Sequence, residues 1–262
     1  MSGTALVTGG GRGIGRTIAR ALTREGYRVA VTGRTTTSLD EAVAAGDAAL
    51  CLPGDASDRR DVDDAVRRTE SELGPLDLVV ANAGRFSAAG PIWESDPDDW
   101  WRDVEVNLRG PQLALWAALQ TMVPRGRGRI VVLGSGIGAE GAPYASAYSS
   151  SKAAVMRLVE SVAAEVEDTP ISVFVISPGL VATDMTQFPE AFLAHYPDWR
   201  DIAQRQGLPP ERAAQLVLEL ASGRYDALSG RFLRTTTDLD EAVAAATEEP
   251  PGTLRVVPWG PE

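Results

Sequence analysis

Residues 5–15, Ala5-Leu6-Val7-Thr8-Gly9-Gly10-Gly11-Arg12-Gly13-Ile14-Gly15, decide the fold. Three apolar residues of a strand run into a glycine-rich turn, and residues 15–24 continue as an amphipathic helix. Glycines let the backbone turn sharply and approach a pyrophosphate, which then lies at the helix N-terminus, where free N–H groups and the dipole favour anions. The segment therefore predicts a dinucleotide-binding unit. Its Gly-x-x-x-Gly-x-Gly spacing differs from the common Gly-x-Gly-x-x-Gly fingerprint and indicates a narrower family.

The rest of the chain alternates strand-length apolar runs with helix-length amphipathic stretches. The expected strands cover residues 5–7, 28–31, 76–80, 129–133 and 171–176, and the expected helices cover residues 15–24, 61–73, 98–123 and 148–166. This alternation predicts an α/β fold, a doubly wound Rossmann-type parallel sheet with helices on both faces. Such sheets bind ligands at the carboxyl ends of their strands, so we expect the functional residues just after each strand.

Composition narrows the classes of function. A chain of 262 residues with 44% hydrophobic content and no evident linker predicts a single dinucleotide-binding and catalytic domain over residues 1–262. The net charge of −11 argues against nucleic acid or an anionic membrane as a partner. Cys51 is the sole cysteine, which excludes an intrachain disulfide and a cysteine-cluster metal site. With no targeting or membrane-spanning stretch, we expect a cytoplasmic protein without a metal.

Lys152 is the only lysine in a chain whose other cationic side chains are arginines, and it follows Tyr148 by four residues. On a helix this spacing places the phenol and the ammonium on one face. Two charges about 5 Å apart in an effective dielectric of about 20 attract by roughly 3 kcal/mol. We therefore expect Lys152 to lower the pKa of Tyr148 by about two units and to make it a proton donor near neutral pH.

Six motifs together resemble the short-chain dehydrogenase/reductases of about 250 residues, in order and in spacing. They are Thr8-Gly9-x-x-x-Gly13-x-Gly15, Asn82-Ala83-Gly84, Asn107, Ser135, Tyr148-x-x-x-Lys152 and Pro178-Gly179. The resemblance covers nearly the whole chain and is strongest to carbonyl reductases similar to 3-oxoacyl-carrier-protein reductase. It implies an NAD(P)-dependent oxidoreductase that reduces a ketone to an alcohol, or runs the reverse oxidation.

The resemblance assigns catalytic roles to Asn107, Ser135, Tyr148 and Lys152. Ser135 would hydrogen-bond the substrate carbonyl, Tyr148 would protonate the new alkoxide, and Lys152 would lower the pKa of Tyr148 while holding the nicotinamide ribose. Asn107 would mark a local kink whose backbone carbonyl supports a water chain to the lysine. Taken alone, Ser135 would usually be only a turn former, and for Asn107 a surface or capping role would be favoured.

The resemblance also assigns the cofactor contacts, although the first position of the usual Asn-Asn-Ala-Gly is Ala81 here. Asp55 would accept from the adenine amino group beside Ala56, although an aspartate in a turn is the commoner reading. The remaining contacts are Gly9, Arg12, Gly13, Ile14, Gly15, Arg34, Thr35, Asn82, Ala83, Gly84, Tyr148, Lys152, Pro178, Gly179, Val181 and Thr183.

The end of the second strand predicts the cofactor preference. An acidic residue there would bond the ribose 2′-OH and repel a 2′-phosphate, but the chain continues Thr32-Gly33-Arg34 with no acid before Asp40. Arg34 and Arg12, with Thr35 as a hydroxyl donor, can converge on a 2′-phosphate instead. We expect NADPH to be preferred over NADH; the alternative is that both arginines are merely solvated.

The resemblance places a substrate lid at about residues 185–207 and leaves an extended C-terminal tail at about 234–262. Phe188, Phe192, His195, Tyr196 and Trp199 suit a sizeable apolar or aromatic carbonyl substrate, and packing of a lid helix explains them equally well. His195, the only histidine, is expected to have a passive surface or packing role and not a catalytic one, because Tyr148 and Lys152 already provide the proton.

Assembly is expected to be a homotetramer or homodimer through the helices that begin near Asp98 and Tyr148, the first of which carries Trp100, Trp101 and Trp116. Two other functions compete with a reductase. A catalytically silent NAD(P)-binding sensor would have no use for Ser135, Tyr148 and Lys152. A sugar-nucleotide epimerase or dehydratase is disfavoured by the glycine spacing and the short C-terminal region.

Overall fold

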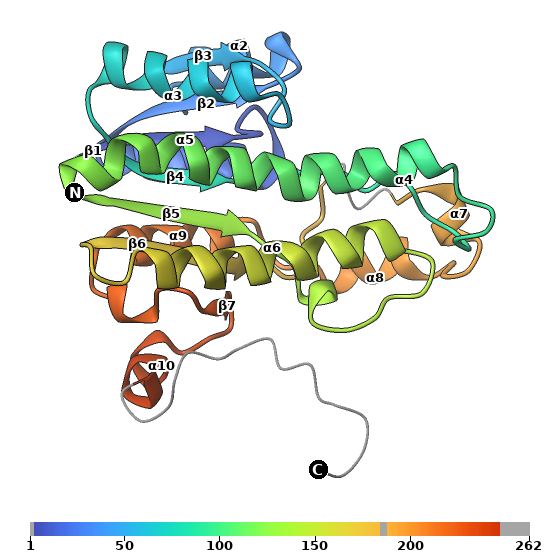
Figure 1. Ribbon diagram of the computed structural model, residues 1–262. Coiled ribbons are helices and arrows are strands. Elements are labelled where there is room, and N and C mark those ends of the chain that lie inside the picture. The colour runs from blue at the N-terminus through green and yellow to red at the C-terminus, as the bar shows by residue number, and fades with distance from the viewer. Residues whose placement is uncertain (1–2, 184–187, 247–262) are drawn as a thin grey trace.

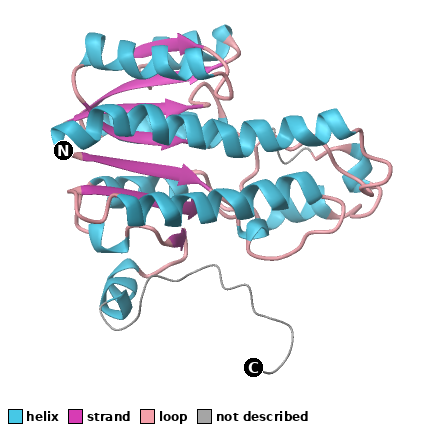
Figure 2. Ribbon diagram, in the orientation of Figure 1, coloured by secondary structure: helices cyan, strands magenta, loops and turns pink. Residues whose placement is uncertain are grey.

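The computed structural model describes residues 3–183 and 188–246, which are built on one seven-stranded sheet (Figures 1 and 2). The strands are β1 (Gly3–Thr8), β2 (Tyr27–Gly33), β3 (Leu50–Pro53), β4 (Leu76–Ala81), β5 (Gly128–Leu133), β6 (Ile171–Ser177) and β7 (Phe232–Arg234). Their order is β3-β2-β1-β4-β5-β6-β7, and every pair is parallel. Both directions of winding start at β1, which confirms the predicted doubly wound sheet.

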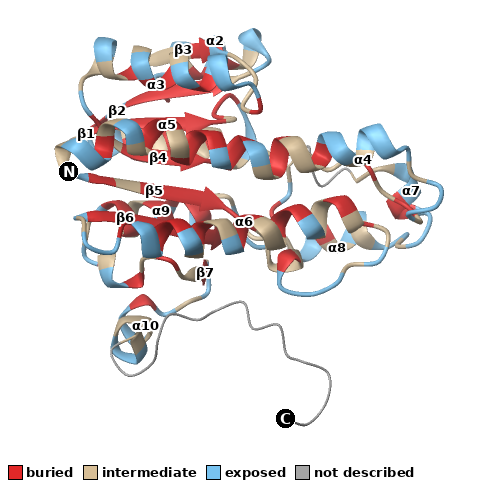
Figure 3. Ribbon diagram, viewed as in Figure 1, coloured by how far each residue is buried: buried red, intermediate tan, exposed pale blue. Residues whose placement is uncertain are grey.

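Helices cover both faces of the sheet because its strands are apolar on both sides. In β1, Leu6 belongs to the cluster that packs against α3, α5 and α6, whereas Ala5 and Val7 belong to the cluster under α1 and α9. Figure 3 shows that the strands of the sheet are mostly buried. The main helices are α1 (Gly13–Arg24), α2 (Thr36–Ala44), α3 (Arg59–Leu73), α4 (Pro97–Val104), α5 (Gly110–Arg125), α6 (Ser146–Glu165), α9 (Glu211–Ala221) and α10 (Leu239–Ala246). This two-sided burial makes the sheet a rigid support for the loops at its carboxyl edge.

One predicted helix is interrupted. Instead of a single helix over residues 98–123, α4 and α5 are joined by a π-helical turn, η1 (Glu105–Arg109), which contains Asn107. A π turn inserts one extra residue into the helical ladder and is frequent at functional sites.

The functional end of the molecule lies beyond the carboxyl ends of the strands. There α4 projects past the sheet, and the short helices α7 (Glu190–Leu193) and α8 (Trp199–Gln206) lie at the same end of the molecule, at the right of Figure 1. These two helices occupy the predicted lid, of which residues 185–187 lie outside the described residues, as do residues 247–262 of the predicted tail. Within the part of the chain that the structure describes, no helix has the length and apolarity to cross a bilayer.

Candidate active site

The loop after β1 owes its shape to its glycines. Gly9 and Gly13 have φ values of 66° and 54°, a left-handed conformation that other residues rarely adopt. A Cβ on Gly15 would lie 2.3 Å from the Gly9 carbonyl oxygen, so the first turn of α1 can sit against the loop only without a side chain. The predicted turn is therefore formed as the sequence indicated.

Asn82, at the end of β4, fastens this loop. Its Nδ2 donates to the carbonyl oxygens of Thr8 and Gly9 at 2.8 and 3.2 Å. In return, Thr8 Oγ1 accepts from the backbone N–H groups of Asn82 and Ala83 at 3.0 and 3.1 Å. The resemblance assigned Asn82 only a cofactor contact, whereas the structure shows that its side chain also holds two cofactor motifs together.

The start of α1 fits a bound pyrophosphate. Arg12 occupies the N-cap without a side-chain cap, and the first turn contains no acidic residue. Backbone N–H groups at a helix start, with the dipole behind them, attract anions. The loop after β6 closes this site from the other side, since a Cβ on Gly13 would lie 3.5 Å from Thr183 Cγ2.

Pro178, Gly179 and Val181 form that loop and are held from the lid side. Val181 makes an isolated parallel bridge with Leu208, and Leu208 donates its N–H to the Leu180 carbonyl at 2.6 Å. Leu208, just after the predicted lid, therefore anchors the segment that the resemblance assigns to the nicotinamide carboxamide.

Asp55 follows β3 and is already hydrogen-bonded. Its Oδ1 accepts from the N–H and the hydroxyl of Ser57 at 2.9 and 2.7 Å, and Arg102 lies 3.4 Å from Oδ2. Burial raises the pKa of Asp55, but the hydrogen bonds from Ser57 and the charges of Arg102 and Arg34 together outweigh this effect. The pKa of Asp55 is therefore lowered overall, and the carboxyl group stays ionised. An ionised Asp55 keeps Oδ2 as an acceptor at the place predicted for adenine. Ala56 lies beside it, and the Ala56 carbonyl approaches Gly110.

Arg34 and Thr35 follow β2, and both are exposed, as is Arg12. Thr35 caps α2 without using its side chain, so its hydroxyl is not consumed by the helix. The glycine loop lies against this segment, because a Cβ on Gly11 would stand 2.6 Å from Ser38 Oγ. The structure thus brings the segments of Arg12 and Arg34 to the same corner of the sheet.

Ser135 and Tyr148 meet at the carboxyl end of β5. Ser135 caps the short turn η2 (Gly136–Gly138), where its Oγ accepts from the Ile137 N–H at 3.4 Å, and its side chain also hydrogen-bonds Tyr148. The same hydroxyl therefore serves as a turn former and as a neighbour of the phenol. Ser177 Oγ accepts from the N–H groups of Gly136 and Gly179 at 3.1 and 3.4 Å. It links the serine loop to the loop after β6, a role that the sequence did not suggest.

Lys152 is 3% exposed, one turn along α6 from Tyr148. Its Nζ lies 5.7 Å from the centre of the Tyr148 ring and donates to the Leu133 carbonyl at 2.7 Å. The turn η2 crosses the helix closely here, because a Cβ on Gly138 would stand 2.7 Å from the Lys152 carbonyl carbon. The space around Lys152 is therefore tight.

The predicted lowering of the Tyr148 pKa is wrong in sign. Burial raises the pKa of Tyr148 to about 12; the hydrogen bond with Ser135 opposes this rise, and the charge of Asp103 adds to it. Burial also lowers the pKa of Lys152 to about 8. Desolvation outweighs the attraction expected from two solvated charges, and the ammonium directs its proton to Leu133 instead.

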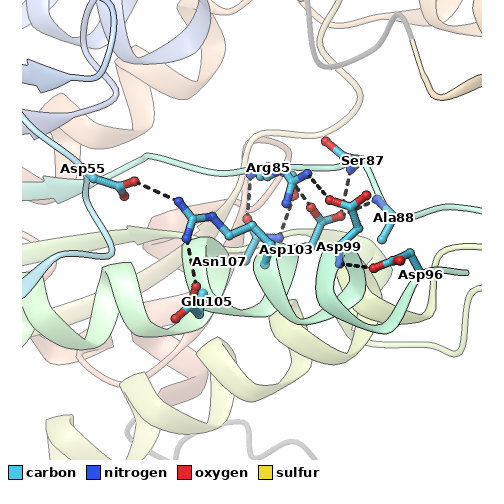
Figure 4. A network of polar contacts seen from close by, with 10 residues as sticks. Asp55, Arg85, Ser87, Ala88, Asp96, Asp99, Asp103, Glu105 and Asn107 are labelled. Carbon is cyan, nitrogen blue, oxygen red and sulfur yellow. Dashed lines mark hydrogen bonds and ion pairs between the residues drawn. The ribbon is translucent and has the colours of Figure 1, made fainter.

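Asn107 is fully buried in η1, so the surface or capping reading is wrong. Its Oδ1 accepts from the Arg85 N–H at 2.8 Å, and its Nδ2 donates to the Arg85 carbonyl at 2.7 Å (Figure 4). The expected kink is present as a π turn. The side chain uses it to bind the backbone just beyond Asn82-Ala83-Gly84.

Aromatic rings gather above Tyr148. Phe86 lies 5.0 Å from the Tyr148 ring and 5.4 Å from that of Phe192 in α7. Phe188, Tyr196 and Trp199 surround Phe192, and His195 stacks on Tyr144 at 3.7 Å. The lid aromatics therefore do pack on the body, and His195 packs against Tyr144. Tyr144 and Phe188 have φ values of 62° and 44°, a strain typical of functional sites.

No group of three or more His, Cys, Asp or Glu side chains could hold a metal ion within residues 3–183 and 188–246.

The site consists of a glycine loop for a dinucleotide and a Ser135–Tyr148–Lys152 cluster at the sheet edge. These two features define the class of NAD(P)-dependent oxidoreductases.

Comparison with known proteins identifies the family. A family model described as short chain dehydrogenase matches residues 3–192. A short chain dehydrogenase of Pseudocercospora fijiensis is 33% identical over 96% of this chain and 85% of its own length. A 3-oxoacyl-[acyl-carrier-protein] reductase of Bos taurus is 36% identical over 71% of this chain and 79% of its own. The chain belongs to the short-chain dehydrogenase/reductase family.

Solved structures of reductases superpose on this chain and agree with the family assignment. Levodione reductase superposes with a TM-score of 0.81 at 26% identity, over 88% of this chain and 95% of that one. A variant of actinorhodin polyketide ketoreductase with NADPH gives a TM-score of 0.78 at 31% identity, over 89% and 95%. The protein is an NAD(P)-dependent oxidoreductase.

Proposed function

We propose that the protein reduces a ketone to a secondary alcohol with NADPH, and that Tyr148 supplies the proton. The observation that carries this proposal is the joint placement of Ser135, Tyr148 and Lys152. A hydroxyl donor, a phenol and an ammonium converge at one sheet edge, beside a loop shaped for a dinucleotide.

The residues divide the chemistry among them. The nicotinamide would supply a hydride to the carbonyl carbon. Ser135 is placed to donate a hydrogen bond to the carbonyl oxygen as negative charge develops there, and Tyr148 to give that oxygen its proton. Lys152, held at the Leu133 carbonyl, keeps a positive charge beside the phenol. Asn107 holds the backbone beyond residues 82–84.

The pKa of the Tyr148 phenol supports reduction of a ketone, rather than oxidation of an alcohol, as the main direction of the reaction. A pKa of about 12 keeps the Tyr148 phenol protonated throughout the physiological pH range, as a proton donor must be. An alkoxide is a still stronger base, so the transfer remains downhill. Oxidation of an alcohol needs the phenolate, which this environment disfavours.

Arg12, Arg34 and the unused Thr35 hydroxyl support NADPH over NADH. β2 ends at Gly33, and Asp40 lies inside α2, one turn beyond the start of that helix, where it accepts from the Cys51 thiol at 3.3 Å. No carboxylate therefore follows β2 directly to repel a 2′-phosphate. The actinorhodin ketoreductase structure, which holds NADPH, lends further support.

The aromatic rings above Tyr148 support a sizeable apolar or aromatic ketone as the substrate. Phe86, Phe188, Tyr196 and Trp199 are only partly buried, whereas Phe192 is buried behind them. Residues 188–207 would then act as a lid over the substrate, within a single-domain enzyme.

Assembly as a homodimer or homotetramer is supported by the outer face of α5 and α6. A groove there is lined by Leu115, Trp116, Leu119, Val123, Leu158 and Val162. Trp116 lies under the Arg59 guanidinium at 4.7 Å, whereas Trp100 donates to Ser146 Oγ at 3.0 Å and so faces α6. We further propose a reducing, cytoplasmic location, in keeping with the free thiol of Cys51.

A substrate panel tests the proposal. The purified protein is mixed with NADPH or NADH and with cyclic, aromatic and 3-oxoacyl thioester ketones, and the alcohols are identified. We expect alcohol to form with NADPH in preference to NADH. Tight NADPH binding with no product from any ketone would favour a catalytically silent sensor instead.

A further inference from the structure

Asp103, in the last turn of α4, is a buried charge near the site. It forms an ion pair with Arg85, whose Nε lies 3.3 Å from Asp103 Oδ1. That oxygen and Arg85 Nη1 are buried without a hydrogen bond. A buried carboxylate is costly, so its surroundings should show what it does.

The second carboxylate oxygen binds the loop after β4. Asp103 Oδ2 accepts from the N–H groups of Ser87 and Ala88 at 2.8 and 2.9 Å (Figure 4). One turn further along the same helix, Asn107 holds the N–H and the carbonyl of Arg85. Two successive inward-facing side chains therefore fix four backbone groups within residues 85–88.

The residue enclosed by these four bonds is Phe86. Its ring contacts Tyr148 at 5.0 Å and the lid residue Phe192 at 5.4 Å. The loop continues to Gly90, whose N–H donates to the Tyr144 carbonyl at 2.9 Å. We call the four hydrogen bonds from Asp103 and Asn107 to residues 85–88 the clamp. Through this short segment the clamp is connected to the Tyr148 phenol, to the lid and to the strained Tyr144.

We propose that Asp103 is a positioning residue that fastens residues 85–88, places the Phe86 ring beside Tyr148 and holds a buried negative charge at this end of the site. It acts through the loop and through its field, without touching a reacting atom. Phe86 is then the ring that sets the gap between the phenol and the lid. This inference rests on the proposed role of Tyr148 as the proton donor.

The charge has a definite effect. Three polar groups from three elements act on Tyr148: Ser135 after β5, Lys152 in α6 and Asp103 in α4. Asp103 raises the pKa of Tyr148 through its negative charge, and Arg85, paired with both Asp103 and Asp99, carries the opposite charge. Asp103 thereby favours the protonated phenol that reduction requires.

Two variants with opposite charge changes test the field. Asp103→Asn keeps an oxygen acceptor for Ser87 and Ala88 but removes the negative charge, whereas Arg85→Gln removes the positive one and leaves the backbone bonds to Asn107. Tyrosine labelled with carbon-13 at the ring ζ position reports ionisation by NMR, and Tyr148→Phe identifies the signal among the five tyrosines. We expect the Tyr148 titration to begin at lower pH in Asp103→Asn, at higher pH in Arg85→Gln, and near the parent in the double variant.

Amide exchange tests the clamp in the same proteins. In Asp103→Leu the Ser87 and Ala88 amides should exchange about tenfold faster or more, and in Asp103→Asn they should remain protected. Shifts of the Tyr148 titration in one common direction, or none, would overturn the role of the charge, and unchanged exchange in Asp103→Leu would overturn the clamp. If Asp103→Leu does not fold, loss of protection in Asp103→Asn would overturn the clamp instead. Neither readout needs turnover, so a protein that reduces no ketone would fail the proposed function without affecting this test.

Discussion

Replacing Lys152 by arginine separates the charge of this residue from its shape. The lysine is 3% exposed, and its Nζ reaches the Leu133 carbonyl at 2.7 Å beneath the turn of residues 136–138. A guanidinium is planar, larger and permanently charged. Gly138 approaches the backbone of Lys152 so closely that an added Cβ would clash, and the lysine side chain is itself buried, so a larger guanidinium has little room.

The cost can be bounded from this geometry. Overpacking a close-packed site costs about 1–3 kcal/mol, and displacing the phenol or the cofactor adds to the barrier itself. We expect turnover to fall about a hundredfold or more, which corresponds to roughly 2.7 kcal/mol, while NADPH affinity falls less.

The assay is reduction of any accepted ketone between pH 6 and 10, with NADPH binding and thermal unfolding measured alongside. Arg157→Lys, on the exposed side of the same helix, is the matched control and should leave turnover unchanged. A Lys152→Arg protein within threefold of the parent at every pH would show that the lone lysine has no special role.

Other predictions concern the cofactor, the assembly and the effect of pH. NADPH should bind to the parent protein at least about tenfold more tightly than NADH, and Arg34→Asp should narrow or invert this difference in affinity. Equal affinities for the two cofactors in a fluorescence titration of the parent would contradict the proposed preference. Light scattering should show a dimer or tetramer that Val123→Arg, at an exposed position in the α5–α6 groove, converts to smaller species; a parent that is monomeric at micromolar concentration would rule this assembly out. The depressed pKa of Lys152, about 8 against 10.5, means that the unfolded state binds more protons between these values, so its contribution to stability rises with pH. Between pH 8 and 10 the parent should gain about 2 kcal/mol in urea unfolding relative to Lys152→Met, and the same slope in both proteins would refute the buried ammonium.

Local sequence signals predicted the sheet and most of the strand-end motifs. The glycine loop could be recognised because left-handed φ values and close helix approach demand glycine, as Gly9, Gly13 and Gly15 show. The strands β3 and β7 were absent from the predicted strands because four and three residues give little periodicity. The π turn at Asn107 was expected only as a kink, because its extra residue leaves no mark in the apolar pattern.

Long-range effects could not be predicted. The pKa of Tyr148 depends on burial by segments distant in sequence, and this reversed the sign expected from its helical neighbour Lys152. Asp103 looked like one more acid in an acidic stretch, and only the return of residues 85–88 onto α4 shows that it is buried. Asn82 and Ser177 likewise gained their roles from partners on other strands.

The central claim is that Tyr148 protonates a ketone that NADPH reduces, and Tyr148→Phe tests it most directly. NADPH consumption and alcohol formation should be measured together for the parent and the variant, with NADPH binding measured for each. We expect the variant to bind NADPH within about threefold of the parent and to lose turnover by about a hundredfold or more, because the hydroxyl that donates the proton is gone. A Tyr148→Phe protein that forms the alcohol at a rate near that of the parent would contradict the account.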